Sequence, residues 1–471
     1  MSKYQKLINN SIIFTIGNFG SKLLLILLVP LYTYSLTPAE YGSVDLLMTT
    51  VSLLLPIVSL NIFDGVIRFV MDKNESKEKV FTNSMLLLFA MAVASSFGIM
   101  CLSFFFPLTN HFWYYLYWIL ILQALQTTFA QFARGIDKIK VYALSGVLLT
   151  FATAVLNIVL LVIFKMGIQG YLISLVLANI ITIVYLACVL KIWSFFNFKN
   201  LDKQLIKRLL IYSLPLIPNA IMWWLMNASS RYFVVFFIGS SANGLLAVAN
   251  KIPSLISLLN TIFMQAWQMS AIEEFDSKDK SVFYSKVFNY FSLVMLLGAS
   301  GLLMILKPLV KWVINIDFYN SWEIVPPLLL AVVYSSYSGF LGTNYIAAKK
   351  TQGVFFSSII GALASVILNL LLIPSIGTSG VGISSMVSFF LIFIIRYFDT
   401  KKFIHMTINI KNIIIIHLVI ILQIVFLYLL DGSKLMIVEV LLFFCTIFIS
   451  KEIFILIFQF LRKKYVKKDE S

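Results

Sequence analysis

The chain has 471 residues, of which 60% are hydrophobic and only 12% are charged. A soluble domain carries about 25% charged residues, so this composition excludes a globular core with a solvated surface. The net charge is +16, but the basic residues lie between apolar segments and do not gather on one arm. Nucleic acid is therefore not an expected partner, and the composition predicts an integral membrane protein.

Apolar stretches recur along the whole chain. A helix of about 20 apolar residues spans a bilayer, and the sequence contains about fourteen stretches of that length. We predict an all-α integral membrane fold with helices over 9–33, 41–69, 82–106, 113–133, 141–164, 168–190, 209–237, 243–270, 287–307, 322–346, 354–376, 380–398, 412–430 and 435–460.

The distribution of Lys and Arg predicts the orientation of these helices. With the N-terminus inside, the cytoplasmic segments hold 27 of the 36 basic residues and the opposite side holds only four, at Lys165, Lys307, Lys311 and Lys434. The remaining five lie within helices. Cytoplasmic loops carry the excess of positive charge in membrane proteins, so both termini are expected in the cytoplasm.

The segment 191–208 alternates basic residues with Trp, Phe and Leu, a pattern typical of an amphipathic segment at the membrane interface. It separates two sets of six predicted helices. We therefore expect an N-terminal six-helix lobe over 1–190, the linker over 191–208 and a C-terminal six-helix lobe over 209–402. Residues 403–471 then form two additional membrane helices and a basic cytoplasmic tail.

The two lobes resemble each other in sequence. At a shift of 212 residues, 133–164 matches 345–376, and after a two-residue gap the match continues into the next helix. A second match has a shift of 202 residues. Six helices per lobe predict that both insert in the same orientation, about an axis along the membrane normal, with substrate bound between them. The matched pairs include Asn157/Asn369, Leu160/Leu372, Gly167/Gly377, Gly170/Gly380, Ser174/Ser384 and Gly42/Gly244.

Signatures of enzymes and metal sites are missing from the sequence. The pattern Gly377-x-x-Gly380-x-Gly382 lies between two predicted membrane helices, which indicates a tight turn and not a phosphate-binding loop. The three histidines and three cysteines have no metal-ligand spacing. We predict no catalytic residues, no metal and no cofactor.

Charged residues inside the predicted helices are the candidates for function. A charge at the bilayer centre costs about 2.5–3.5 kcal/mol on insertion scales, so it usually faces a cavity or a partner. Lys22 lies in the middle of the first helix, too deep to reach the interface easily. Arg231 and Lys251 lie in the outward half, where extension of the side chain to the interface is an equally good explanation.

Three further charges lie in the second predicted helix. Asp64 and Arg68 are spaced i, i+4 near its inner end, so a local ion pair explains both. Arg68 is nevertheless kept as a substrate-binding candidate. Asp45, near the outer end, and Asp64 are the candidates for coupling to an ion gradient. A cavity lined by cations inside a bilayer suits an anionic head group, in particular phosphates.

Several short motifs resemble the polysaccharide transporter branch of the multidrug/oligosaccharidyl-lipid/polysaccharide exporter superfamily. This branch contains the O-antigen and capsule repeat-unit flippases of bacteria. The motifs are Asn9-Asn10-Ser11, Leu36-x-Pro38-x-Glu40-Tyr41-Gly42, Arg68-Phe69, Asn243-Gly244, Ala249-Asn250-Lys251-Ile252 and the pair Asn157/Asn369. In one departure, Ser230 precedes Arg231 where many relatives carry an acidic residue, which puts ion coupling at that position in doubt.

The resemblance implies a flippase of the bacterial inner membrane that works by alternating access. Its substrate would be an oligosaccharide on undecaprenyl diphosphate, for O-antigen, capsule or exopolysaccharide synthesis. On this reading Lys22, Arg231 and Lys251 neutralise the diphosphate and the polyprenyl tail stays among the membrane lipids. A proton or sodium gradient would drive transport, and the residues do not identify the ion.

Two alternatives remain open. A multidrug exporter of the same superfamily would favour an acidic cavity for cationic drugs, and the basic balance of the intramembrane charges argues against it. A membrane-embedded polysaccharide polymerase or acyltransferase would need a sizeable outer loop and an active-site signature. The longest predicted outward loop runs only over 308–321.

The charge asymmetry predicts the location of the linker and of the C-terminus. A reporter active only in the cytoplasm should be active when fused at Asn200 or Ser471, and a periplasmic reporter should be inactive at both. A periplasmic signal at either position would contradict the predicted topology and the pairing of the lobes.

Overall fold

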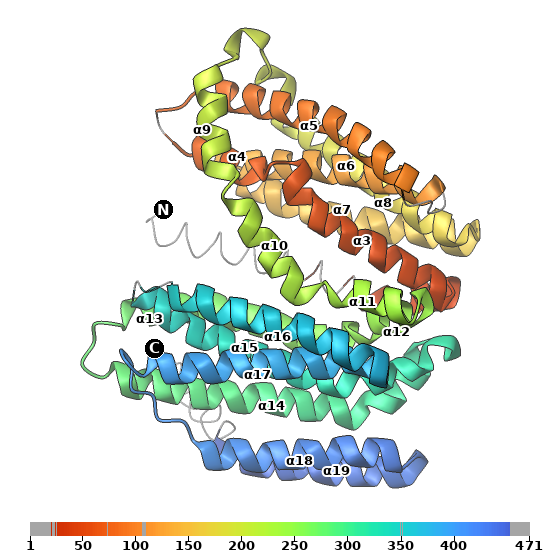
Figure 1. The fold of residues 1–471 in the computed structure, drawn as a ribbon, viewed down its shortest axis with the longest axis vertical. Coiled ribbons are helices and arrows are strands. Elements are labelled where there is room, and N and C mark those ends of the chain that lie inside the picture. Colours follow the sequence, from red (N-terminus) through yellow and green to blue (C-terminus); the bar gives the residue numbers. More distant parts are fainter. Residues whose placement is uncertain are drawn as a thin grey trace, which may run out of the picture. The chain divides into compact units, whose positions relative to one another are not determined.

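The computed structural model describes residues 20, 24, 26–72, 74–105, 110–348, 350 and 352–452. All regular elements in this part of the chain are helices, most of them long and apolar, as expected for a multi-pass membrane protein (Figure 1). The chain forms two compact units. Unit 1 holds the described residues up to Val235 together with Gly239–Gly244, and unit 2 holds Phe236–Ile238 and the described residues from Leu245 onward.

Unit 1 is built around one central helix, α6, which contacts α3, α4, α5, α7 and α8. Small residues such as Ala124, Thr128 and Ala130 are buried on α6 and let neighbouring helices approach closely. The helices of unit 1 are α2 Val29–Ser35, α3 Pro38–Val58, α4 Ile62–Val70, α5 Lys77–Phe105, α6 Asn110–Gly135, α7 Ile139–Asn157, η1 Ile158–Ile163, α8 Gly167–Leu190, η2 Ile192–Ser194, η3 Phe198–Asn200, α9 Lys203–Ser213, α10 Leu216–Asn227 and most of α11 Ser230–Phe237.

Unit 2 is also built around one helix, α15, which packs against α13, α14 and α17. Its buried small residues, among them Ser336, Ser338 and Gly342, allow the same close packing. After α12 Ser240–Ala249, which continues from unit 1 into unit 2, the helices are α13 Lys251–Glu273, α14 Lys280–Val313, η4 Ile316–Ile324, α15 Val325–Ala347, α16 Gln352–Ile376, α17 Ser379–Thr400, α18 Ile410–Leu429 and α19 Gly432–Ile449.

The predicted all-α membrane fold is confirmed, but the count of fourteen membrane helices is not. Eleven described helices are long and apolar enough to cross a bilayer, and the bent pair α12 and α13 makes twelve. The predicted helix 9–33 lies largely outside the described residues. The predicted helix 113–133 exists as α6, which has the length of a span but carries Gln123, Gln126 and Gln131 and is less apolar.

Three helices that the sequence predicts as continuous are broken in the structure. The predicted helix 243–270 is divided into α12 and α13, which are bent by 41°. The predicted helix 41–69 is divided into α3 and α4 because Leu60 and Asn61 adopt left-handed conformations, four and five residues after Pro56. The predicted helix 209–237 is divided into α9, α10 and α11. Its first part begins at Lys203, inside the predicted linker. Apolar runs do not reveal such breaks, since neighbouring helices satisfy the freed backbone groups.

The local structure of the two lobes agrees with the internal repeat. Gly167 and Gly377 both have positive φ angles, of 54° and 68°. An added Cβ on Gly170 would lie 3.2 Å from the carbonyl oxygen of Leu160, and one on Gly380 would lie 2.8 Å from that of Leu372. The repeated glycines therefore serve the same two purposes, a tight turn and a close helix contact. The lobe boundaries predicted from the repeat remain a prediction.

The last two helices pack along α14 in unit 2 (Figure 1). Ser300 of α14 donates a hydrogen bond to the Oε1 atom of Gln423 at 2.7 Å, and Gln423 donates to Glu439 at 2.9 Å. Nearer the end of α14, Lys307 forms an ion pair with Asp431 at 2.7 Å. Polar groups buried at membrane depth need such partners, so α18 and α19 are bound to the second unit by specific contacts.

Within unit 1, the start of α3 lies directly against residues 240–244. A Cβ added to Gly42 would overlap the carbonyl oxygen of Ser240, and a Cβ added to Gly244 would overlap that of Pro38. The contact is symmetric under the second sequence match, because Ser240 and Gly244 lie 202 residues after Pro38 and Gly42. Two of the family-like motifs, Pro38-x-Glu40-Tyr41-Gly42 and Asn243-Gly244, thus contact each other through backbone atoms.

We expect Gly42→Ala and Gly244→Ala to destabilise the protein, because a methyl group at either position must push two backbone segments apart. Overpacking typically costs about 1–3 kcal/mol, which should lower the apparent melting temperature of the detergent-solubilised protein by several degrees. Gly146→Ala is the matched control, since nothing lies within 4 Å of its added Cβ. Equal melting temperatures for the three variants would contradict the contact.

Candidate functional site

The first turn of α3 is fixed by a capping box. Thr37 is the N-cap, its hydroxyl accepts a hydrogen bond from the backbone N–H of Glu40 at 3.3 Å, and the Glu40 carboxylate accepts from the backbone N–H of Thr37 at 2.9 Å. Pro38 occupies the first helical position, where its missing N–H costs nothing. The sequence therefore starts α3 at a defined residue and places Gly42 and Asp45 on its first two turns.

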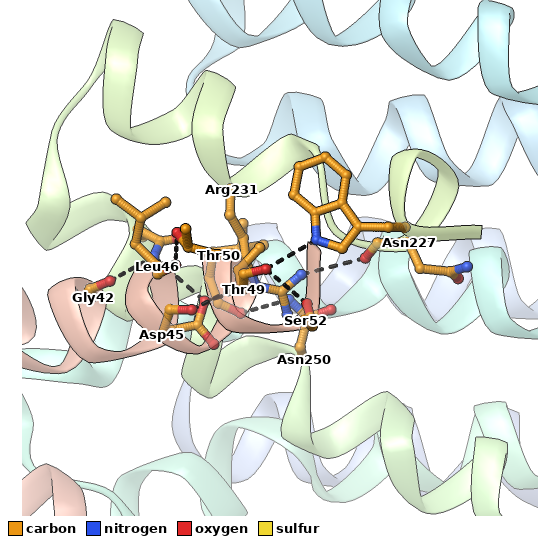
Figure 2. A network of polar contacts seen from close by, with 12 residues as sticks. Gly42, Asp45, Leu46, Thr49, Thr50, Ser52, Asn227, Arg231 and Asn250 are labelled. Carbon is orange, nitrogen blue, oxygen red and sulfur yellow. Dashed lines mark hydrogen bonds and ion pairs between the residues drawn. The ribbon is translucent and has the colours of Figure 1, made fainter. Parts of the chain in front are cut away.

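Asp45 and Arg231 form an ion pair inside unit 1 (Figure 2). The Nε atom of Arg231 lies 2.7 Å from the Oδ2 atom of Asp45, and the two side chains are only 18% and 20% exposed. Asn243 donates hydrogen bonds to the carbonyl oxygen of Gly42 at 2.8 Å and to Asp45 at 3.4 Å. The close approach of Gly42 thus brings a carboxylate of α3 to an arginine 186 residues later in the chain.

Aromatic and hydroxyl groups of the same helices form further contacts next to the ion pair. Trp224 of α10 donates from its indole N–H to the carbonyl oxygen of Thr49 at 3.0 Å. The hydroxyls of Thr50 and Tyr232 lie 2.6 Å apart, and the rings of Trp224 and Tyr232 pack edge to face. These contacts connect α3 to α10 and α11 through polar atoms, an arrangement that the sequence did not suggest.

Arg231 has N–H donors that no residue in the described part of the chain accepts. A guanidinium carries five N–H groups, and in the described part of the chain two of them donate, one to Asp45 and one to the carbonyl oxygen of Asn227 at 3.3 Å. Three N–H groups therefore remain for other acceptors. A carboxylate and a phosphate both suit the forked geometry of a guanidinium, so the same side chain is able to bind an added anion.

The other predicted site residues have different surroundings. Lys22 is outside the described residues. Lys251 is the half-buried first residue of α13. Arg68, at the exposed end of α4, lies 3.8 Å from Asp72. Asp64 accepts a hydrogen bond from Asn61 at 2.8 Å.

The predicted ion pair between Asp64 and Arg68 is therefore wrong. The break in the helix before Asn61 brings the Asn61 amide to Asp64, and Arg68 has an acid one turn farther along, Asp72. Of the six candidates, Asp45 and Arg231 form an ion pair with each other. Ser230 precedes Arg231 in the sequence, and the acidic partner of Arg231 is Asp45 of α3.

Two buried charged residues were missed. Among the described residues, the guanidinium of Arg396 in α17 donates to neutral oxygens only, including the hydroxyl of Ser357 at 2.9 Å and the carbonyl of Ser338 at 2.7 Å. Its place near a helix end made it look like a cytoplasmic loop residue. Glu439 of α19 is fully buried. The signal in the sequence is an acidic residue within an apolar run, as at Asp45.

Sequence comparison identifies one family. Residues 7–268, more than half of the chain, match the model of the family described as polysaccharide biosynthesis protein. No curated protein matches the chain in sequence.

Solved transporter structures share the fold. The lipid II flippase MurJ in an inward closed conformation aligns with a TM-score of 0.67 and 15% identity over 94% of this chain and 98% of its own. An inward-facing multidrug resistance MATE transporter of the MOP superfamily aligns with a TM-score of 0.65 and 13% identity, over 81% of this chain and 95% of its own. A MOP superfamily transporter from Pyrococcus furiosus aligns with a TM-score of 0.56 and 14% identity, over 84% of this chain and 95% of its own.

A double-mutant cycle tests the ion pair. Asp45→Asn should destabilise the protein by about 2 kcal/mol, because it leaves a largely buried arginine without its counter-charge. Arg231→Gln in the same chain should restore part of that loss. Arg68→Gln, which removes an exposed pair, should change stability by less than about 0.5 kcal/mol. Strictly additive effects on the melting temperature would show that Asp45 and Arg231 do not interact.

Proposed function

Because this chain belongs to the polysaccharide biosynthesis protein family, we propose that it is a flippase for undecaprenyl-diphosphate-linked oligosaccharide repeat units. The shared fold of MurJ and MATE transporters supports a transporter. The finer assignment to O-antigen, capsule or exopolysaccharide synthesis in the inner membrane of a bacterium, with both termini in the cytoplasm, is part of the same proposal. The charge asymmetry of the loops supports the orientation.

The observation that carries the proposal is the burial of Arg231 together with its hydrogen-bond partners. Arg231 is a largely buried cation in a membrane protein, held by one carboxylate and retaining three donors in the described structure. A cation fixed in this way is able to bind a diphosphate through bidentate hydrogen bonds without first paying for a new conformation of its side chain. Asp45 keeps the site close to neutral when no substrate is bound, which reduces the cost of burying Arg231.

The same pair offers a route to ion coupling. When a diphosphate binds the guanidinium of Arg231, the carboxylate of Asp45 loses its counter-charge. Binding of a proton or a sodium ion at Asp45 would restore neutrality in a medium of low dielectric. We infer that Arg231 and Asp45 pair with each other when the site is empty. When the site is occupied, Arg231 binds the substrate and Asp45 binds the ion. Asp64, bonded to Asn61, remains a second candidate for coupling.

Lys22 and Lys251 are proposed as further cations for the diphosphate. Leucine at either position would favour membrane insertion. Arg68 lies at the exposed end of α4 beside Asp72, a position that favours contact with lipid head groups over contact with a buried diphosphate.

Transport should depend on positive charge at Arg231. Arg231→Gln should lower surface polysaccharide at least about tenfold in a flippase-deficient strain, because one lost charge contact removes 1.4 kcal/mol or more of binding. Arg231→Lys should retain part of the activity. Lys22→Leu should lose activity, and Lys22→Arg should keep some.

The control is Lys434→Gln, at an exposed residue near the start of α19, with the abundance of every variant measured in the membrane fraction. Normal surface polymer from Arg231→Gln at wild-type abundance would contradict the proposed site. Efflux of cationic drugs that persists in Arg231→Gln would favour the multidrug exporter instead.

A further inference from the structure

The linker between α8 and α9 is a fixed part of unit 1. The hydroxyl of Thr82, at the start of α5, donates to the carbonyl oxygen of Phe195 at 3.1 Å. The amide of Asn83 donates to the carbonyl oxygen of Asn200 at 2.9 Å and accepts from the backbone N–H of Asp202 at 3.0 Å. Both Thr82 and Asn83 are fully buried. The aromatic residues of the linker are therefore held against α5.

A cavity of about 660 Å³ lies beneath this linker, and every residue that lines it is apolar. Phe81, Phe129 and Ile192 are buried in its wall. Phe89 of α5 and Phe198 of the linker are each 70% exposed at its rim. Because α5 is the least buried of the membrane helices of the first unit, the cavity faces the lipid side of that helix and is open to a hydrocarbon chain.

The length of the cavity along α5 is about half the thickness of the hydrocarbon core of a bilayer. Its lining on α5 extends from Phe81 to Ala92, and eleven residues of α-helix measure about 16 Å. The hydrocarbon core of a bilayer is about 30 Å thick. A cavity that ends near the middle of the bilayer suits the acyl chain of a phospholipid. The tail of a long polyprenyl carrier would extend far beyond it.

Positive charge lies next to the cavity in the sequence. Lys191 precedes Ile192 and Lys199 follows Phe198, and both lysines are exposed without an acidic partner in the described structure. Arg208, which lies in α9, is already paired with Glu75. A hydrogen bond from the backbone N–H of Leu205, together with the charge of Lys79, holds the pKa of Asp202 below its usual range.

We propose that this cavity binds one acyl chain of an anionic phospholipid, with the head group at Lys191 and Lys199. Basic residues beside an apolar surface at the membrane interface favour anionic lipids. The site is distinct from the proposed diphosphate site, since it uses none of the charges assigned to the diphosphate. The amphipathic linker thereby acquires a function of its own.

Native mass spectrometry of the full chain tests this site. The protein is purified from membranes into mild detergent and equilibrated with equal amounts of phosphatidylglycerol and phosphatidylcholine of the same chain length. One phosphatidylglycerol should be retained preferentially. Ala92→Phe, which fills the cavity, should abolish that retention. The double variant Lys191→Gln/Lys199→Gln should reduce the preference about 30-fold, because each lysine near an anionic head group contributes about fivefold.

Matched variants separate the site from general effects. Ala94→Phe adds the same side chain to the exposed face of α5, outside the residues that line the cavity, and should retain the lipid. Lys278→Gln/Lys286→Gln removes two exposed lysines of the second unit and should keep the preference. Equal retention of both lipids by the unmodified protein would overturn the proposal. Undiminished retention by Ala92→Phe, or displacement of the lipid by an equal amount of undecaprenyl phosphate, would do so too.

Discussion

The first unit depends on the contact between Gly42 and residues 240–244. Two backbone segments approach so closely there that neither glycine has room for a Cβ. This approach places Asn243 against the carbonyl oxygen of Gly42 and Asp45, and it brings Asp45 to Arg231. A larger side chain at either glycine would separate the segments and with them the ion pair. The chemistry of the candidate site thus follows from a steric constraint.

The largely buried arginines Arg231 and Arg396 differ in their hydrogen-bond partners. A cation whose donors already bind protein oxygens offers an anion few hydrogen bonds, whereas a cation with a single carboxylate and unused donors is able to change partners. Arg231 belongs to the second kind, and Arg396, whose donors go to serine hydroxyls and backbone carbonyls, is engaged in packing α15, α16 and α17. Burial alone does not distinguish them; the hydrogen-bond partners do.

Specific polar contacts also hold the peripheral elements. The linker is bound to α5 through Thr82 and Asn83, and α18 and α19 are bound to α14 through Gln423, Glu439 and Lys307. In a bilayer the lipid tails are as apolar as leucine, so apolar surface alone gives helices little reason to associate. Hydrogen bonds and close small-residue contacts then decide which helices are neighbours.

The sequence by itself determined the class of fold, and the local structure at the repeated glycines agrees with the internal repeat. Hydropathy suffices for the fold class because a bilayer requires long apolar helices, and the repeated Gly170/Gly380 pair reflects the same local helix contact in both halves. Only the tertiary structure decided that Asp45 meets Arg231, that Asp64 does not meet Arg68 and that α3 ends before Asn61. These outcomes depend on helix breaks and contacts between distant segments, which leave no periodic pattern in the sequence.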